Sequence, residues 1–246
     1  MNPIPTVTKN ILVINVLLFL ATWLAPSYGI NLEDYLGLHF FLADKFNASQ
    51  LVTYMFMHGG FPHLFFNMFA VWMFGRVLEQ VWGPRRFLFY YLICGIGAGL
   101  IQLLVCYVQM RIIEGNLSTD AINIVLNTGA QAMAEGKNFV NSQMGDLNVV
   151  INGTTVGASG AVYAILLGFG MLFPNERLFI IPIPVPIKAK YFVAGYALIE
   201  LYLAFLNNPN DNVAHFAHLG GMIFGFFLIL YWRKKNRNHY DGFHYQ

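Results

Sequence analysis

Charged side chains are scarce in this sequence of 246 residues, because Asp, Glu, Lys and Arg together make up only 11% of it. Soluble domains carry about 25%. The two cysteines, Cys94 and Cys106, are too few for a disulfide framework or a cysteine-based zinc site. A formal net charge of +2 does not predict a nucleic-acid partner. These absences exclude an ordinary soluble domain, a disulfide-rich secreted domain and a nucleic-acid-binding protein.

Hydrophobic residues make up 57% of the sequence. A bilayer core about 30 Å thick needs about 20 apolar residues per helix, and fewer where a helix is buried among others. The sequence therefore predicts an all-α membrane protein with six transmembrane helices over residues 11–232. The expected spans are Ile11 to Leu24, Leu64 to Trp82, Phe87 to Val108, Gly157 to Phe173, Tyr191 to Leu206 and Val213 to Trp232.

The first of these segments has a second interpretation, as a cleaved signal peptide. The only basic residue before it is Lys9, and no clear small-residue cleavage site follows it. We therefore favour a retained span.

Lys and Arg fall mainly on one side of the predicted spans. That side has Lys9, Arg85, Arg86, Arg177, Lys188, Lys190, Arg233, Lys234, Lys235 and Arg237. The opposite side has only Lys45, Arg111 and Lys137, among eight acidic residues. Because positively charged loops resist translocation, both termini are predicted to be cytoplasmic: an N-terminus over 1–10 and a basic tail over 233–246. The loops over about 26–62 and 111–156 are then exterior, the second with a helical stretch from Asp120 to Glu135.

Polar residues inside spans are costly in hydrocarbon and are therefore informative. His63 and Asn67 lie at positions i and i+4 at the start of the second span, so they share one face of the helix. Capping of the helix start is the structural alternative for His63. Glu79 follows Arg76 by three residues, which predicts a structural ion pair, and Glu200 in the fifth span has no predicted partner.

Two stripes of small residues predict that the fourth and sixth spans pack closely. The first stripe has Gly160, Ala164 and Gly168, and the second has Ala217, Gly221 and Gly225. Close contact would bring Ser159 and His218 together at similar depth. A serine beside an imidazole can act as a nucleophile with a general base.

Structural alternatives exist for this serine and histidine as well. A lone intramembrane serine usually bonds its own backbone, and a lone histidine is often a packed core residue. His215 is the competing base, since it lies on nearly the same face as His218 but closer to the exterior end. The histidines have no carboxylate or thiolate partner at ligand spacing, so the sequence predicts no metal and no cofactor.

Three motifs resemble those of the rhomboid family of intramembrane serine proteases. Gly157-Ala158-Ser159-Gly160 resembles its GxSG motif, the stretch from Ala217 to Gly225 resembles AHxxGxxxG, and His63 to Asn67 resembles HxxxN. The order of the motifs and their placement in the second, fourth and sixth spans also agree. The first exterior loop departs from many members because residues 26–50 contain neither Trp nor Arg.

The resemblance implies a role for each motif residue. Ser159 would be the nucleophile and His218 the base, in a dyad without an acidic third member, and Tyr163 would pack on the imidazole. His63, Asn67 and the backbone N–H of Ser159 would stabilise the oxyanion. Gly157, Gly221 and Gly225 would support this arrangement, and His58 and Glu79 also match positions of the family pattern.

The implied function is hydrolysis of peptide bonds in or next to transmembrane segments of membrane-protein substrates. The partners would be those substrates and the lipid bilayer. The expected location is a multi-pass position in a bacterial inner membrane, with the site open to the non-cytoplasmic side. The alternative is a catalytically silent rhomboid-like protein that binds client proteins. The presence of both Ser159 and His218 favours the protease.

Overall fold

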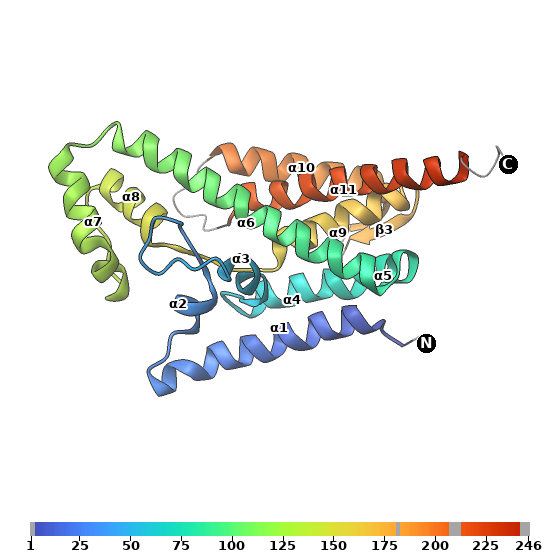
Figure 1. Ribbon diagram of the computed structural model, residues 1–246, viewed down its shortest axis with the longest axis horizontal. Coiled ribbons are helices and arrows are strands. Elements are labelled where there is room, and N and C mark those ends of the chain that lie inside the picture. The colour runs from blue at the N-terminus through green and yellow to red at the C-terminus, as the bar shows by residue number, and fades with distance from the viewer. Residues whose placement is uncertain (1–2, 181–182, 207–212, 242–246) are drawn as a thin grey trace.

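The computed structural model describes residues 3–180, 183–206 and 213–241. Its long helices lie side by side in one bundle, with the start of the first helix and the end of the last at the same end (Figure 1). The long helices are α1 (Thr6–Leu24), α6 (Pro84–Glu114), α9 (Ser159–Leu172), α10 (Ala189–Leu206) and α11 (His215–Asp241).

The second expected span is a continuous run of three helical segments. Residues 61–82 comprise the α-helix α4 (Phe61–Ala70), a π-helical turn η3 (Val71–Gly75) and the α-helix α5 (Arg76–Trp82). A π-turn changes the helical register locally and often lies near functional sites. His63 and Asn67 both lie in α4, before this turn.

Within the described residues, four helical segments are long and apolar enough to cross a membrane: Thr6–Tyr28, Pro84–Glu114, Ala189–Leu206 and His215–Lys235. These segments make the chain a multi-pass membrane protein. The count of six crossings and the cytoplasmic location of both termini stay predictions. Residues 233–241, expected in the cytoplasmic tail, continue helix α11, and residues 242–246 lie outside the described part of the chain.

Helix α9 occupies the centre of the bundle. It packs against α4, η3, α5, α6, α10 and α11, and none of its residues is exposed. A helix that is apolar on every side needs protein or lipid around it, and α9 is surrounded by protein. Helix α1, in contrast, fully buries only Thr8, Ile11 and Asn15 along one face and leaves many of its apolar side chains, such as Leu17 and Trp23, exposed.

Helices α9 and α11 meet backbone to backbone. A Cβ added at Gly221 would lie 2.0 Å from the carbonyl oxygen of Gly160. One at Gly225 would lie 2.4 Å from the hydroxyl oxygen of Tyr90, which donates a hydrogen bond to the carbonyl oxygen of Ala164 at 2.7 Å. Small residues in both helices permit this approach, as the two sequence stripes lead one to expect.

The segments outside the long helices form two groups. At one end lie the 3₁₀-helices η1 (Ala25–Tyr28) and η2 (Tyr54–Phe56), helices α2 (Leu32–Leu36), α3 (Gln50–Thr53), α7 (Thr119–Ala134) and α8 (Ser142–Asn152), and strands β1 (Leu38–His39) and β2 (Thr154–Thr155). Strand β1 pairs antiparallel with β2 and so joins the two long loops. Helix α7 matches the stretch expected from Asp120 to Glu135, whereas α8 was not expected. At the other end, β3 (Arg177–Ile180) and β4 (Ile183–Lys188) pair as an antiparallel hairpin that the sequence pattern does not predict.

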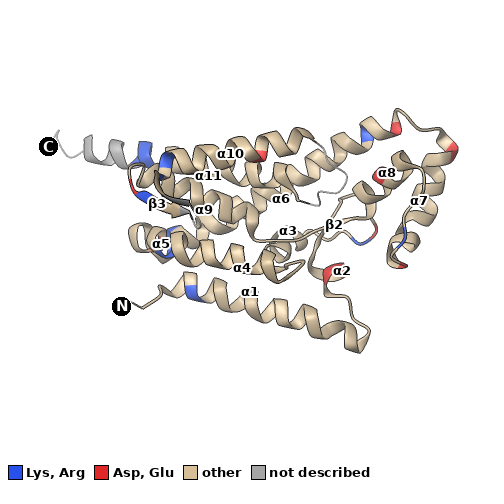
Figure 2. Cartoon of the chain, turned by 180° about the vertical axis from the view of Figure 1, so that it is seen from behind, with Lys and Arg blue, Asp and Glu red and all other residues tan. Residues whose placement is uncertain are grey.

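Charges separate along the bundle. Figure 2 shows most Lys and Arg residues at the end with α5 and β3, and most Asp and Glu residues at the end with α2, α7 and α8. The separation agrees with the charge asymmetry in the sequence. Asp211, one of the acidic residues on the predicted exterior side, lies outside the described residues.

The predicted ion pair between Arg76 and Glu79 is wrong. The Glu79 carboxylate instead accepts hydrogen bonds from the backbone N–H groups of Val7 and Thr8, at 2.9 and 2.7 Å, and from the Thr8 hydroxyl at 2.8 Å. The Arg76 guanidinium lies 4.8 Å from the ring centroid of Trp72. The first N–H groups of a helix have no acceptor within the helix and attract negative charge, so Glu79 is the cap of α1 supplied from α5.

We predict that Gly221→Ala destabilises the protein, because the new methyl group would overlap the backbone of α9. Overpacking of this kind costs on the order of 1–3 kcal/mol. Gly195→Ala in α10 is the matched control, since an added Cβ there meets nothing within 4 Å. Thermal unfolding in detergent measures both variants. Equal melting temperatures for the two would show that α9 and α11 do not depend on this contact.

Glu79→Gln is predicted to weaken the attachment of α1. An amide has only one oxygen in place of two, so at least one buried donor of residues 7 and 8 loses its partner, at a cost of about 1–3 kcal/mol. The exposed residue Glu135 is the control, because its pairing with Lys137 lies at the surface. Amide hydrogen exchange at the start of α1 should rise in Glu79→Gln and stay unchanged in Glu135→Gln. Unchanged exchange in both would contradict the capping role.

Candidate active site

Ser159 is the first residue of α9, so its backbone N–H has no acceptor within that helix. The segment before it is attached to Tyr54, which is itself attached to α6. The Gly157 N–H donates to the carbonyl oxygen of Tyr54 at 2.9 Å, and the Tyr54 hydroxyl donates to the carbonyl oxygen of Gly95 at 2.6 Å. Ala158 is fully buried. These contacts fix where the Ser159 side chain begins.

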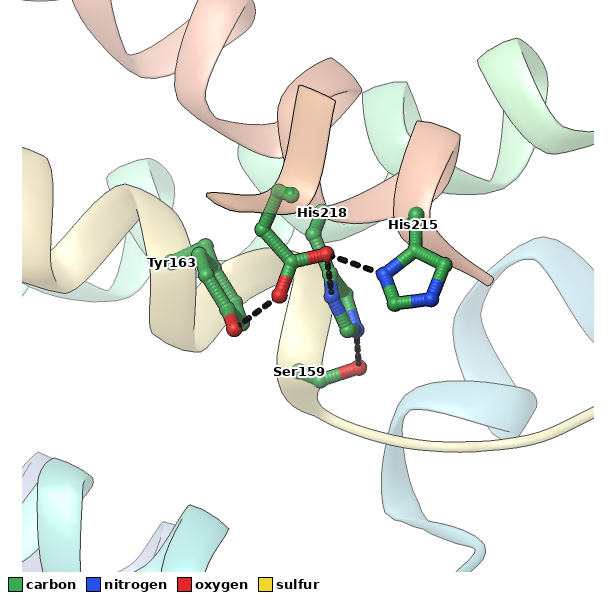
Figure 3. A network of polar contacts seen from close by, with 5 residues as sticks. Ser159, Tyr163, His215 and His218 are labelled. Carbon is green, nitrogen blue, oxygen red and sulfur yellow. Dashed lines mark hydrogen bonds and ion pairs between the residues drawn. The ribbon is translucent and has the colours of Figure 1, made fainter. Parts of the chain in front are cut away.

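His218 faces Ser159 from the first turn of α11. Its Nε2 atom lies 2.7 Å from the Ser159 Oγ, a normal hydrogen-bond distance. The Tyr163 ring stacks on the imidazole, with centroids 4.3 Å apart and planes 10° from parallel. Figure 3 shows Ser159 and Tyr163, both from α9, on two sides of His218. The serine is half-buried and the histidine is buried.

Glu200, which had no predicted partner, lies behind His218. One carboxylate oxygen, Oε2, is 2.9 Å from His218 Nδ1 and 2.6 Å from His215 Nδ1. The other, Oε1, accepts a short hydrogen bond from the Tyr163 hydroxyl. Helices α9, α10 and α11 therefore all contribute to one polar network (Figure 3).

The two candidate bases differ in their placement. His218 bridges Ser159 and Glu200, whereas the Nδ1 of His215 lies against the same carboxylate and its ring is edge-on to His218, with centroids 6.2 Å apart. The Ser159 hydroxyl therefore forms its hydrogen bond with His218. This placement agrees with the ranking from the small-residue stripe.

His63 reaches the same site from α4. Gly157 has φ of +133°, in the region that favours glycine, and a Cβ there would lie 2.8 Å from the His63 ring and 3.4 Å from the Ser159 Oγ. The imidazole therefore passes directly over Gly157, next to the serine. The absence of a side chain at residue 157 is what makes this position possible.

Asn67 lies one turn further along α4 and is buried. Its side-chain NH₂ donates to the backbone carbonyl of His63 at 3.0 Å. An amide NH₂ has two N–H donors, so this bond uses one of them. The structure thus brings His63 close to Ser159, and it gives Asn67 a contact within its own helix.

His58 lies beside this group, in the loop before α4. It is buried, and its ring is edge-on to that of His63 with centroids 5.0 Å apart. Burial, and then the neighbouring His63, lowers the pKa of His58 to about 4. His58 is therefore neutral at physiological pH and packs against His63 as a wall of the site.

Glu200, His215 and His218 also form the one group of potential metal ligands identified in the described part of the chain, with their ligand atoms within 4.8 Å of one another. The histidines therefore do have a carboxylate partner in the folded protein, contrary to the expectation from their spacing in the sequence. The same atoms already contact one another at hydrogen-bond distance. A metal ion would have to replace those bonds.

Only one signal in the sequence pointed to Glu200. An ionisable residue within a transmembrane span needs a partner, and Glu200 lies within the fifth predicted span. Its partners come from two other helices, at sequence separations of 37, 15 and 18 residues. No local spacing rule connects these positions.

The fold and the site define a multi-pass membrane protein with a serine–histidine pair at the starts of helices α9 and α11. The sequence profile of the rhomboid domain matches residues 45–235. The chain belongs to the rhomboid family.

Named relatives agree with this assignment. The human presenilin-associated rhomboid-like protein, mitochondrial, is 28% identical over 238 residues, which is 94% of this chain and 50% of that protein. A Schizosaccharomyces pombe protein named as an uncharacterised mitochondrial rhomboid protein is 26% identical over 244 residues, 87% of this chain and 61% of that protein. YdcA of Bacillus subtilis, named as a candidate rhomboid protease, is 28% identical over 194 residues, 77% of this chain and 70% of that protein. The chain thus spans about half the length of the animal relatives it matches.

Proposed function

We propose that this protein is an intramembrane serine endopeptidase that cleaves membrane-protein substrates in or next to their transmembrane segments. The observation that carries the proposal is the 2.7 Å contact between Ser159 Oγ and His218 Nε2. Family membership supports it, because rhomboid proteins are generally serine proteases, and so does the name of the Bacillus subtilis relative.

The chemistry follows from the two atoms in contact. His218 Nε2 accepts the proton of the Ser159 hydroxyl while Oγ attacks the substrate carbonyl carbon, and the carbonyl oxygen becomes an oxyanion. The protonated imidazole then gives this proton to the leaving amine as the C–N bond breaks. Water hydrolyses the acyl-enzyme in the same manner, with His218 again as the base.

The oxyanion needs donors that are already in place before the reaction. The free N–H of Ser159 at the start of α9 is one candidate. His63 is the second, because its ring passes over Gly157 beside the serine. The remaining N–H of Asn67 is the third, although the Asn67 side chain also bonds the carbonyl oxygen of His63.

The site is proposed to open to the non-cytoplasmic side. Ser159 follows strand β2 by a few residues, and β2 is paired with β1 in the first long loop. Both loops belong to the acidic end of the bundle (Figure 2). Hydrolysis needs water, and the distribution of positive charge predicts that this end faces the exterior. Relatives come from mitochondria and from a bacterium, so the bacterial inner membrane stays a prediction.

Replacement of the nucleophile gives the direct test. Ser159→Ala should lower cleavage of a model transmembrane substrate by at least about a thousandfold and abolish labelling by a fluorophosphonate serine-hydrolase probe. His218→Ala should lose both, and His215→Ala should retain a substantial part of each. Wild-type protein that is folded but never labelled would favour the silent client-binding alternative.

The oxyanion role is tested by His63→Ala and Asn67→Ala. Each should lower kcat more than it raises KM, by up to about 10²- to 10³-fold, because a donor to the developing charge acts mainly in the transition state. The double variant should cost less than the product of the single effects if both serve one oxyanion. Loss of stability with unchanged turnover per folded molecule would assign both residues to helix packing.

A further inference from the structure

We propose that Glu200 is a positioning residue that completes a Ser159–His218–Glu200 triad, where the family pattern implies a dyad without an acidic member. The inference rests on the proposed protease function. Its basis is the continuous chain of contacts from Ser159 Oγ to His218 Nε2, at 2.7 Å, and from His218 Nδ1 to Glu200 Oε2, at 2.9 Å.

The placement of Glu200 is costly for the fold. The residue is 5% exposed in the middle of the apolar helix α10, and its neighbours in the chain, Leu198, Ile199, Leu201 and Tyr202, are exposed outward. A charge in this position needs compensation by hydrogen bonds. The network supplies three contacts from groups able to donate, and those groups come from α9 and α11.

The contact on Nδ1 determines what Nε2 can do. A neutral imidazole carries one proton, and a carboxylate can only accept, so Glu200 holds that proton on His218 Nδ1. Nε2 then has a free lone pair directed at the Ser159 hydroxyl. The opposite tautomer would present an N–H to the serine and could not take its proton. Glu200 thus selects the tautomer that a general base requires.

Glu200 also acts when His218 becomes charged. The imidazolium that forms during attack stands beside a negative carboxylate, which stabilises it, and the Nδ1 proton stays on His218 throughout. Tyr163 has two contacts in this arrangement, since its ring stacks on His218 and its hydroxyl holds Oε1. The carboxylate is therefore fixed on one side by α9 and on the other by α11.

Two substitutions separate charge from shape. Glu200→Gln keeps the size of the side chain and removes the charge, whereas Glu200→Asp keeps the charge on a side chain shorter by one methylene. If the carboxylate positions and stabilises His218, Gln should lower kcat on the order of 10²- to 10⁴-fold with little change in KM, and Asp should retain more activity than Gln. A packing role predicts the reverse ranking, because Gln is the better isostere.

Proton NMR of the detergent-solubilised protein gives a second measurement, the chemical shift of the His218 Nδ1 proton. A merely structural role of Glu200 would not change this shift. In the wild type, the Nδ1 proton of His218 is bonded to a carboxylate and should resonate far downfield. This resonance should be absent in His218→Ala. It should shift upfield in Glu200→Gln, whether the amide oxygen or the amide NH₂ faces His218. The loss of the resonance in His218→Ala distinguishes the His218 proton from the His215 proton. The absence of such a resonance in the wild type would overturn the proposal even if neither Glu200 variant folds.

The fluorophosphonate reaction keeps the two proposals apart. A folded wild type that does not react overturns the protease function, and the triad with it. A wild type that reacts, together with a folded Glu200→Gln protein that reacts at the same rate within about threefold, overturns the role of Glu200 alone. A reacting wild type with a strongly slowed Gln variant and a partly restored Asp variant supports the triad.

Discussion

The arrangement of the site depends on the contact between the backbones of α9 and α11. In a bilayer, helices gain little from the hydrophobic effect against one another, so close packing and hydrogen bonds must hold them together. The carbonyl of Gly160 lies where a side chain at Gly221 would be, and this approach allows a serine and an imidazole to come within 2.7 Å without long side chains between them. One turn of displacement along either helix would separate the pair.

Polar groups within the bundle are satisfied by partners from distant parts of the chain. Glu79 caps the start of α1 from α5, and Glu200 accepts contacts from α9 and α11. Both carboxylates are buried, yet they serve different ends: the first satisfies backbone donors, and the second faces two imidazoles. Within the bundle, buried charge therefore marks the places where helices are joined.

The amino-acid sequence predicts the apolar segments, the two small-residue stripes and the approach of Ser159 to His218, because each depends on helical periodicity, which is local. It does not predict the partners of Glu79 and Glu200, since those depend on how helices are arranged around α9. The hairpin β3–β4 and helix α8 were also missed, because short elements in loops have weak patterns. The contact of Asn67 with its own helix was not anticipated, because an i, i+4 spacing fits a helix cap and a shared site equally well.

Helix α9 has protein on every side, and this has a consequence for how the protein responds to the thickness of its membrane. A helix in contact with lipid adjusts its tilt when the bilayer becomes thicker or thinner. Helices α1 and α10, with many outward apolar side chains, are subject to that adjustment. The depth of Ser159 is set instead by packing against its neighbours. The same site geometry can therefore be maintained in membranes of different thickness. Under the proposed protease function, such membranes would change which substrate bond reaches the serine and leave the cleavage reaction itself unchanged.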